Sequence, residues 1–218
     1  MIERSRYYGR HHIDELVDIG SPQSRETQLE THGRNLFAVL RNWRDLSEHE
    51  HRWNFVLERL RDSFPWLRRL DFDSLGQRVS AQAIRTKSSE EKLSPSDWPD
   101  GFFVSLLQLT AVASGDAGGV VAIDEPENSL HPRLIRALIE AMRDWSAARD
   151  VTVLLATHSP VVLDCYSDAP EQVFVMQPEL DQLPAALDEL RKREWLEHYS
   201  LGDLYSQLEI GAPSDANL

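Results

Sequence analysis

The fold of this chain is decided by Val120-Val121-Ala122-Ile123-Asp124-Glu125-Pro126-Glu127-Asn128-Ser129-Leu130-His131-Pro132 and by the later segment Ala156-Thr157-His158-Ser159-Pro160. The first begins with an apolar run, which predicts a buried strand that carries Asp124 and Glu125 to the edge of a sheet. A second apolar run, residues 151–156, repeats this pattern and leads to His158. Two such strands joined by a helical segment predict a mostly parallel α/β sheet flanked by helices.

Hydrophobic periodicity predicts further elements around these two strands. Apolar residues recur at helical spacing, or run continuously, in four segments, and Pro132 suits the first turn of the last of them. Two strands flank Gly76, followed by a loop and, near the end of the chain, by a third strand of the parallel sheet and a final helix. We expect helices at 34–44, 52–64, 102–113 and 132–145, strands at 67–73, 78–85 and 173–176, a loop at 86–96 and a last helix at 184–199.

These motifs resemble those of the ATP-binding-cassette-type ATPases of the SMC/RecF/OLD group, and the chain is similar to the AbiEii-toxin-like AAA family ATPases. In that group, a Walker B strand, a D-loop and a switch histidine follow one another in this order. The resemblance covers about residues 33–211 and implies a P-loop NTPase fold, ATP and Mg²⁺ as cofactors, and an ATPase-type subunit as partner.

The resemblance implies a role for three side chains. Asp124 would hold Mg²⁺ through water, and Glu125 would be the catalytic base that polarises the attacking water. His158 would be the catalytic switch residue that contacts the γ-phosphate. The alternatives are two solvated acids at a strand end and a histidine that caps a helix or a sheet edge.

Two more motifs are implied by the resemblance. The D-loop matches Asn128, Ser129, Leu130 and His131, although a simple helix-entry turn before Pro132 fits the same residues. The signature motif maps onto residues 98–102, where only Asp100 and Gly101 match, and these are the nucleotide-binding candidates. Pro99 provides neither a hydroxyl nor an N–H for a γ-phosphate, so one charge-assisted hydrogen bond is lost.

A Walker A loop cannot be identified in this sequence. Such a loop needs glycines followed by Lys and Ser or Thr at the start of a helix. No glycine directly precedes any of the three lysines, Lys87, Lys92 and Lys192. Because the family carries this loop near its N-terminus, we expect the chain to correspond to the C-terminal part of such an ATPase.

Composition limits the range of functions. The 218 residues are 41% hydrophobic and carry a formal charge of −13, with 12 acidic and three basic residues in 164–218. This charge argues against a broad nucleic-acid-binding face, so we expect DNA contacts to be local or indirect. One cysteine and no apolar run long enough for a membrane span favour a cytoplasmic protein.

From these features we expect four regions: a polar N-terminal segment at 1–32, in which we identify no chemistry, a helical and β-hairpin insertion at 33–100, the ATPase core at 101–211 and a tail at 212–218. The expected function is ATP binding and hydrolysis by a Walker-B-bearing subunit that is completed by a Walker A loop from elsewhere. By analogy with the family, it would serve in DNA maintenance or phage defence, as a homo- or heterodimer, with a nuclease or toxin partner. The alternative is a catalytically degenerate, ATPase-like binding or regulatory module.

Overall fold

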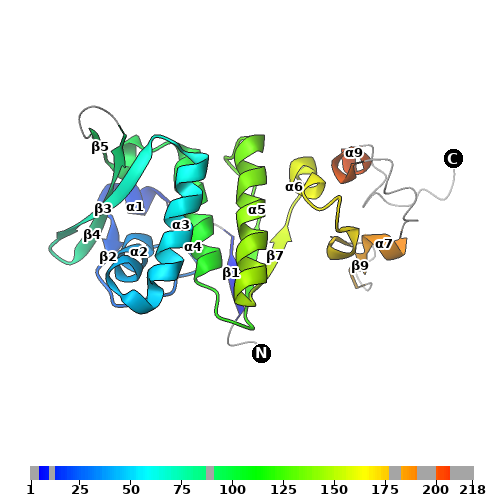
Figure 1. Cartoon of the computed structure of the whole chain (residues 1–218), viewed down its shortest axis with the longest axis horizontal. Coiled ribbons are helices and arrows are strands. Elements are labelled where there is room, and N and C mark those ends of the chain that lie inside the picture. Colours follow the sequence, from blue (N-terminus) through cyan, green and yellow to red (C-terminus); the bar gives the residue numbers. More distant parts are fainter. Residues whose placement is uncertain (1–4, 10–12, 87–90, 177–182, 191–199, 207–218) are drawn as a thin grey trace. The chain divides into compact units, whose positions relative to one another are not determined.

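The computed structural model describes residues 5–9, 13–86, 91–176, 183–190 and 200–206 (Figure 1). The chain divides into two compact units. The larger comprises residues 1–156 and the smaller residues 157–218. Among the described residues, no helix combines the length and apolarity that a membrane crossing needs.

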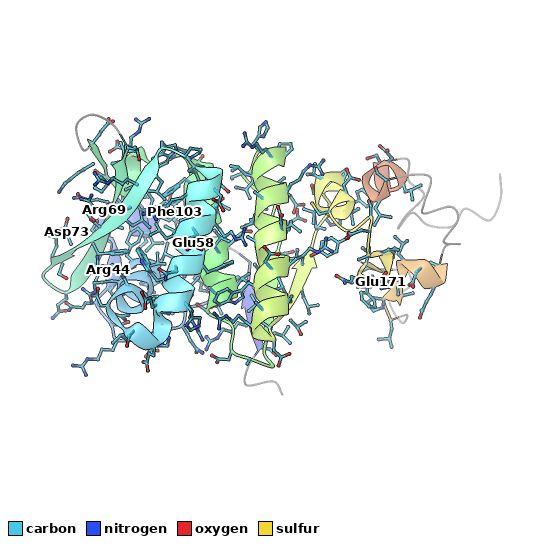
Figure 2. All side chains as sticks on the ribbon, in the orientation of Figure 1. Arg44, Glu58, Arg69, Asp73, Phe103 and Glu171 are labelled. Carbon is cyan, nitrogen blue, oxygen red and sulfur yellow. The ribbon has the colours of Figure 1, made fainter. Side chains whose placement is uncertain are left out.

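The larger unit contains four longer helices. They match the four helices expected from the sequence: α2 Leu36–Asp45, α3 Glu50–Ser63, α4 Asp100–Ala113 and α5 Pro132–Arg149. Helix α4 contacts α2, α3 and α5, and its residues from Phe102 to Ala113 are all buried (Figure 1). Phe103 lies in this interior, whereas Asp73 lies on an exposed hairpin (Figure 2). A helix that is buried on all sides and mostly apolar is typical of a position at the centre of a core.

A three-stranded parallel sheet carries the decisive motif. Its order is β1 (Ser5–Tyr8), β6 (Val120–Asp124) and β7 (Thr152–Ala156), with β6 in the middle. The strands are in register, so that Tyr8 pairs with Ile123 and Asp124 with Ala156. The predicted α/β class with a parallel sheet flanked by helices is confirmed.

The two faces of this sheet differ. Tyr8, Val121 and Ile123 share one face and are buried, while α4 contacts β6 and α5 contacts β7. The register places Tyr7, Ala122 and Leu154 side by side on the other face, where Tyr7 is 57% and Leu154 is 55% exposed. Within the described residues, the outer edge of β7 also pairs with no strand. Apolar side chains and an unpaired strand edge are thus both accessible here.

We expect the isolated chain to self-associate through this face and edge. A charge on an exposed edge strand opposes strand pairing, so Leu154→Lys should reduce the association. Leu75→Lys, at a leucine that is 69% exposed beside the turn at Gly76, is the matched control. Light scattering over a concentration series measures the effect. The expectation would be contradicted if the unaltered chain stayed a monodisperse monomer and bound no dye that detects apolar surface.

A second sheet, in the order β2-β4-β3, contains the two strands of the expected hairpin. The expected hairpin is present as β3 (Leu67–Leu75) and β4 (Arg78–Arg85), and β2 (Ser21–Pro22) pairs with β4. The expected loop at 86–96 is wrong in part, because β5 (Glu91–Leu93) also pairs antiparallel with β4. Glu-Lys-Leu has little intrinsic strand preference, and the strand forms because β4 offers backbone partners along its edge.

The N-terminal segment contributes strands, a helix and buried apolar residues to the fold, although its composition is polar. Besides β1 and β2 it forms α1 (Ile13–Ile19), and it buries Tyr8, Leu16 and Leu29 completely or almost so. The Tyr8 hydroxyl donates to the Leu29 carbonyl oxygen at 2.9 Å, and burial raises the pKa of Tyr8 to about 12. Widely spaced apolar residues give no periodic pattern, which is why the sequence did not reveal these elements.

The smaller unit has its own apolar cluster. Leu187, Leu201 and Leu204 form its centre, and Tyr205 packs against it. The α-helices among its described residues are α6 (Pro160–Asp164), α7 (Leu187–Leu190) and α9 (Leu201–Ser206). Part of the expected helix at 184–199 lies outside the described residues, and its start is instead strand β9 (Ala185–Ala186) followed by α7.

The expected third parallel strand at 173–176 is wrong. Strand β8 (Phe174–Val175) pairs antiparallel with β9 in a separate two-stranded sheet. A short apolar run predicts a strand without fixing its direction, which depends on the segment that lies beside it.

Candidate functional site

Asp124 stands at the carboxyl end of the central strand β6 and is exposed. The Tyr7 hydroxyl donates to Asp124 Oδ2 at 3.1 Å. Tyr7 pairs with Ala122 in the register, and since side chains two residues apart share a face, Tyr7 is a diagonal neighbour of Asp124. The hydrogen bond to Asp124, with smaller contributions from burial and the carboxylate charge, raises the pKa of Tyr7. The phenol therefore remains a donor at neutral pH.

Glu125 adopts an unusual backbone conformation, with φ of 50°. Left-handed conformations are strained for side chains of this kind, and they persist where the surroundings hold them. Two backbone bonds hold this residue: its N–H donates to the Ala156 carbonyl at 2.8 Å, and its carbonyl accepts from the Asn128 N–H at 3.1 Å. The strained turn therefore directs Glu125 away from the line of β6.

Gln108 supports the same turn from the buried helix α4. Its Nε2 donates to the Pro126 carbonyl oxygen at 2.9 Å, and the side chain is only 3% exposed. Ser105 and Thr110, in the same helix, bond instead to carbonyls of their own helix. Gln108 was missed in the sequence, although a glutamine within an apolar helix is a usable signal, because a buried amide needs partners.

The D-loop candidates form the connection from this turn to α5. Ser129 has φ of 63°, and the Leu130 N–H donates to the Glu127 carbonyl at 3.0 Å. His131 is the N-cap residue of α5, because its Nδ1 accepts from the Arg133 N–H at 3.3 Å. A helix-entry turn is therefore present, and it is compatible with a D-loop role.

The signature-like residues lie against this connection. Helix α4 begins at Asp100, with Pro99 as an N-cap that makes no side-chain hydrogen bond. A side-chain carbon at Gly101 would lie 3.6 Å from the Ser129 carbonyl oxygen and 3.1 Å from Leu134 Cδ1. The structure thus brings Gly101 and the D-loop candidates together, as neighbours at one end of α4.

His158 belongs to the smaller unit, in the loop before α6. The Ser159 N–H donates to Thr157 Oγ1 at 2.9 Å, and the Ser159 carbonyl accepts from Val162 and Leu163 as α6 begins. His158 Nδ1 lies 3.0 Å from the Tyr205 hydroxyl oxygen. Tyr7 and Tyr205, which contact Asp124 and His158, and Gln108, which bonds to the adjacent Pro126, are thus residues that the sequence analysis did not predict.

The donor set at Asp124 suits one particular kind of metal site. Among the described residues, no group of three or more His, Cys, Asp or Glu side chains is arranged to hold a metal by itself. Mg²⁺ keeps several waters and is commonly bound by one or two carboxylates together with substrate phosphates. A single exposed carboxylate at a strand end fits Mg²⁺ that arrives with a nucleotide.

Comparison with known proteins assigns the fold to a family of AAA domains, which suggests an ATPase-type, nucleotide-binding function. The chain belongs to the family described as "AAA domain, putative AbiEii toxin, Type IV TA system", whose model matches residues 2–164. A curated relative is Protein ea59 of Escherichia phage lambda, which is 48% identical over 44 residues. The match covers 20% of this chain and 8% of ea59, so the chain spans only a small part of that relative's length. The predicted similarity to this AAA family is confirmed.

If Asp124 holds Mg²⁺ through water, as the resemblance implies, Tyr7→Phe should weaken divalent-metal binding, because the Tyr7 hydrogen bond fixes the orientation of this carboxylate. Loss of such an outer contact lowers metal affinity by roughly 10-fold or more. Mn²⁺, followed by electron paramagnetic resonance, is a suitable probe. Tyr8→Phe is the matched control, since Tyr8 lies on the opposite, buried face. Equal Mn²⁺ affinity in the Tyr7 and Tyr8 variants would contradict the expectation.

Proposed function

We propose that the chain binds and hydrolyses ATP as the Walker-B-bearing part of an ATPase whose Walker A segment is supplied elsewhere, by a partner or by a further part of the same polypeptide. The observation that carries this proposal is the pair Asp124 and Glu125 at the carboxyl end of the central parallel strand. Ligands of open α/β sheets bind at this edge. Membership of an AAA family supports the same activity.

Each residue has a defined task in this proposal. Asp124 holds a magnesium-bound water through the carboxylate that Tyr7 orients. Magnesium, when bound with the nucleotide, supplies charge stabilisation of the phosphates. Glu125 accepts the proton of the attacking water, and the left-handed turn fixes the backbone position from which its side chain extends. His158 contacts the γ-phosphate, which is the role that the resemblance implies for it.

The D-loop and signature-like residues support a dimeric ATPase. Gly101 and Ser129 are neighbours in one chain, as expected if both face a second ATPase subunit. The start of the 14-residue helix α4 offers backbone N–H groups to an anion. The proposed partner is therefore another ATPase-type subunit, in a homo- or heterodimer, and a nuclease or toxin would be the effector. The proposed setting in phage defence or DNA maintenance is an analogy with the resembled ATPases, and the matched family is described as a putative toxin of a Type IV TA system.

A second candidate function is a degenerate ATPase-like module that binds a partner without hydrolysis. Pro99 favours it, because this N-cap offers neither hydroxyl nor N–H where the family uses a serine. The sequence also contains no glycine-rich segment followed by Lys and Ser or Thr. ATP hydrolysis by a completed assembly separates the two functions.

We expect the purified chain alone to bind Mg-ATP weakly or not at all. Most phosphate contacts of P-loop ATPases come from the Walker A loop, and the remaining carboxylates repel a nucleotide unless a cation bridges them. Calorimetric titration with Mg-ATP tests this directly. Binding in the low-micromolar range would show that the chain contains a complete nucleotide site and would overturn the proposal of a Walker A segment from elsewhere.

The ATPase activity is tested in an assembly of this chain with a protein that supplies a Walker A loop. The chain is co-expressed with candidate proteins that contain a GxxxxGK[ST] motif, starting with the product of the reading frame immediately upstream, and phosphate release is measured. Hydrolysis that is lost in Asp124→Asn supports the proposed function, because an amide is a poorer ligand for a hard cation. Equal hydrolysis in the Asp124→Asn assembly would overturn the role of Asp124.

A further inference from the structure

The backbone of Glu125 is unfavourable for two separate reasons. Its φ of 50° lies in the left-handed region, which residues with a side chain rarely adopt. Glu125 also directly precedes Pro126, and a residue before proline is driven toward extended conformations with negative φ. Such a conformation persists only where the surrounding structure holds it. The contacts of this turn therefore decide where the Glu125 side chain begins.

Hydrogen bonds tie the turn to different parts of the larger unit. The Glu125 N–H donates to the Ala156 carbonyl of β7 at 2.8 Å, and the Asn128 N–H closes the turn on the Glu125 carbonyl at 3.1 Å. The bond to α4 is made by a side chain, because Gln108 Nε2 donates to the Pro126 carbonyl oxygen at 2.9 Å. Gln108 is 3% exposed and Pro126 is buried, so water competes little for this bond.

Packing alone does not explain an amide at position 108. The second polar atom of this side chain, Gln108 Oε1, is buried and accepts no hydrogen bond from the described residues. A buried acceptor without a partner costs free energy, and a methionine would fill a similar volume without that cost. We therefore attribute the amide to the bond that it donates to Pro126.

Helix α4 also contacts the D-loop candidates at its start. Gly101 and Gln108 are seven residues apart, which is about two turns, so they lie on the same face of α4. A side-chain carbon at Gly101 would lie 3.6 Å from the Ser129 carbonyl oxygen. One face of α4 thus meets the connection between β6 and α5 at two points, near Ser129 and at Pro126.

We propose that Gln108 is a positioning residue for Glu125, and that its amide fixes the turn from which the Glu125 side chain extends. The inference rests on the proposed function, in which Glu125 is the catalytic base. A reacting group that is misplaced by about 1 Å loses up to about 100-fold in rate. Because Asp100 and Gly101 begin the same helix, Gln108 also connects the base to the end of α4 that faces the second subunit in the proposed dimer.

The direct test is amide hydrogen exchange of the full chain, followed residue by residue by nuclear magnetic resonance. In Gln108→Met, the amides of Glu125 and Asn128 should exchange roughly 2- to 10-fold faster, as expected for the loss of one hydrogen bond. Exchange within α4 should change little, because the variant removes the orphaned acceptor together with the donor. Thr110→Val is the matched control, since the buried Thr110 hydroxyl bonds to the Leu106 carbonyl of its own helix.

Unchanged exchange of Glu125 and Asn128 in Gln108→Met would overturn the inference. So would a rise in exchange throughout α4, because Gln108 would then serve the core and not the turn.

Gln108→Glu tests the donor itself with a side chain of the same shape. At about pH 5 a buried carboxyl is protonated and can donate where the amide does, so protection of the two turn amides should be restored. As the carboxyl ionises at higher pH, this protection should be lost relative to Thr110→Val at the same pH. Protection at about pH 5 that is no better than in Gln108→Met would overturn the role of the donor.

A kinetic arm in a completed ATPase assembly separates the inference from the proposed function. Gln108→Met should lower kcat by roughly 10-fold or more with KM unchanged, and should have no further effect on kcat in the Glu125→Gln background. Equal losses in both backgrounds would overturn action through Glu125. Full activity of Glu125→Gln would overturn the base that the proposed function assigns, whereas the exchange measurement would still decide whether Gln108 holds the turn.

Discussion

In a completed ATPase assembly, Glu125→Gln is expected to lower hydrolysis by roughly 100-fold or more while ATP-dependent association is kept or tightened. General bases contribute about this factor, and glutamine has the size of glutamate without its proton affinity. The turn does not depend on the carboxylate, because backbone bonds to Ala156 and Asn128 hold residue 125 in its left-handed conformation. Phosphate release measures turnover, and analytical ultracentrifugation with and without ATP measures association.

Glu140→Gln, at an exposed position of α5, is the matched control and should leave both quantities unchanged. Hydrolysis that is equal in the Glu125→Gln and unaltered assemblies would show that this carboxylate is not the base. The degenerate-module function would then be favoured. A loss of association in Glu125→Gln would instead show that the substitution damages the turn, which contradicts the support described here.

The sequence predicted the fold wherever apolar residues recur at helical spacing or form a continuous run. The four long helices and the strands β6 and β7 follow from such patterns. It failed where pairing is decided by a distant partner. Strand β1 forms because β6 offers an open parallel edge, and β8 pairs with β9 rather than with the main sheet. Neither partner can be read from the local residues.

The candidate site shows the same division. Asp124 and Glu125 were identified from a contiguous motif, and the structure places them at the expected strand end. The side chains that support the site come from other elements: Tyr7 from β1, Gln108 from α4 and, for His158, Tyr205 from α9. Such contacts depend on tertiary packing, so no local sequence pattern predicts them. Polar residues in apolar surroundings, such as Gln108, are the exception.

Gly202→Ala is expected to have the largest effect on the smaller unit. An added side-chain carbon would lie 2.6 Å from the Pro160 carbonyl oxygen and 2.6 Å from Asp164 Oδ1. The Asp164 side chain can rotate, whereas the Pro160 oxygen belongs to the backbone of α6 and cannot move alone. Helices α6 and α9 must therefore separate, which opens the cluster of Leu201 and Leu204. Overpacking of this kind costs about 1–3 kcal/mol.

Hydrogen exchange of the amides in residues 161–164 and 201–206 measures this effect, and it should rise in Gly202→Ala while exchange in α4 is unchanged. Asp203→Ala, at the exposed neighbouring position, is the control and should exchange as the unaltered chain does. The ¹⁵N nuclear magnetic resonance signal of the His158 imidazole should also shift in Gly202→Ala, because Tyr205, whose hydroxyl lies 3.0 Å from His158 Nδ1, belongs to α9. Unchanged exchange would contradict the close contact of α9 with α6. A rise in exchange without a shift at His158 would show that the contact between Tyr205 and His158 survives when the helices separate.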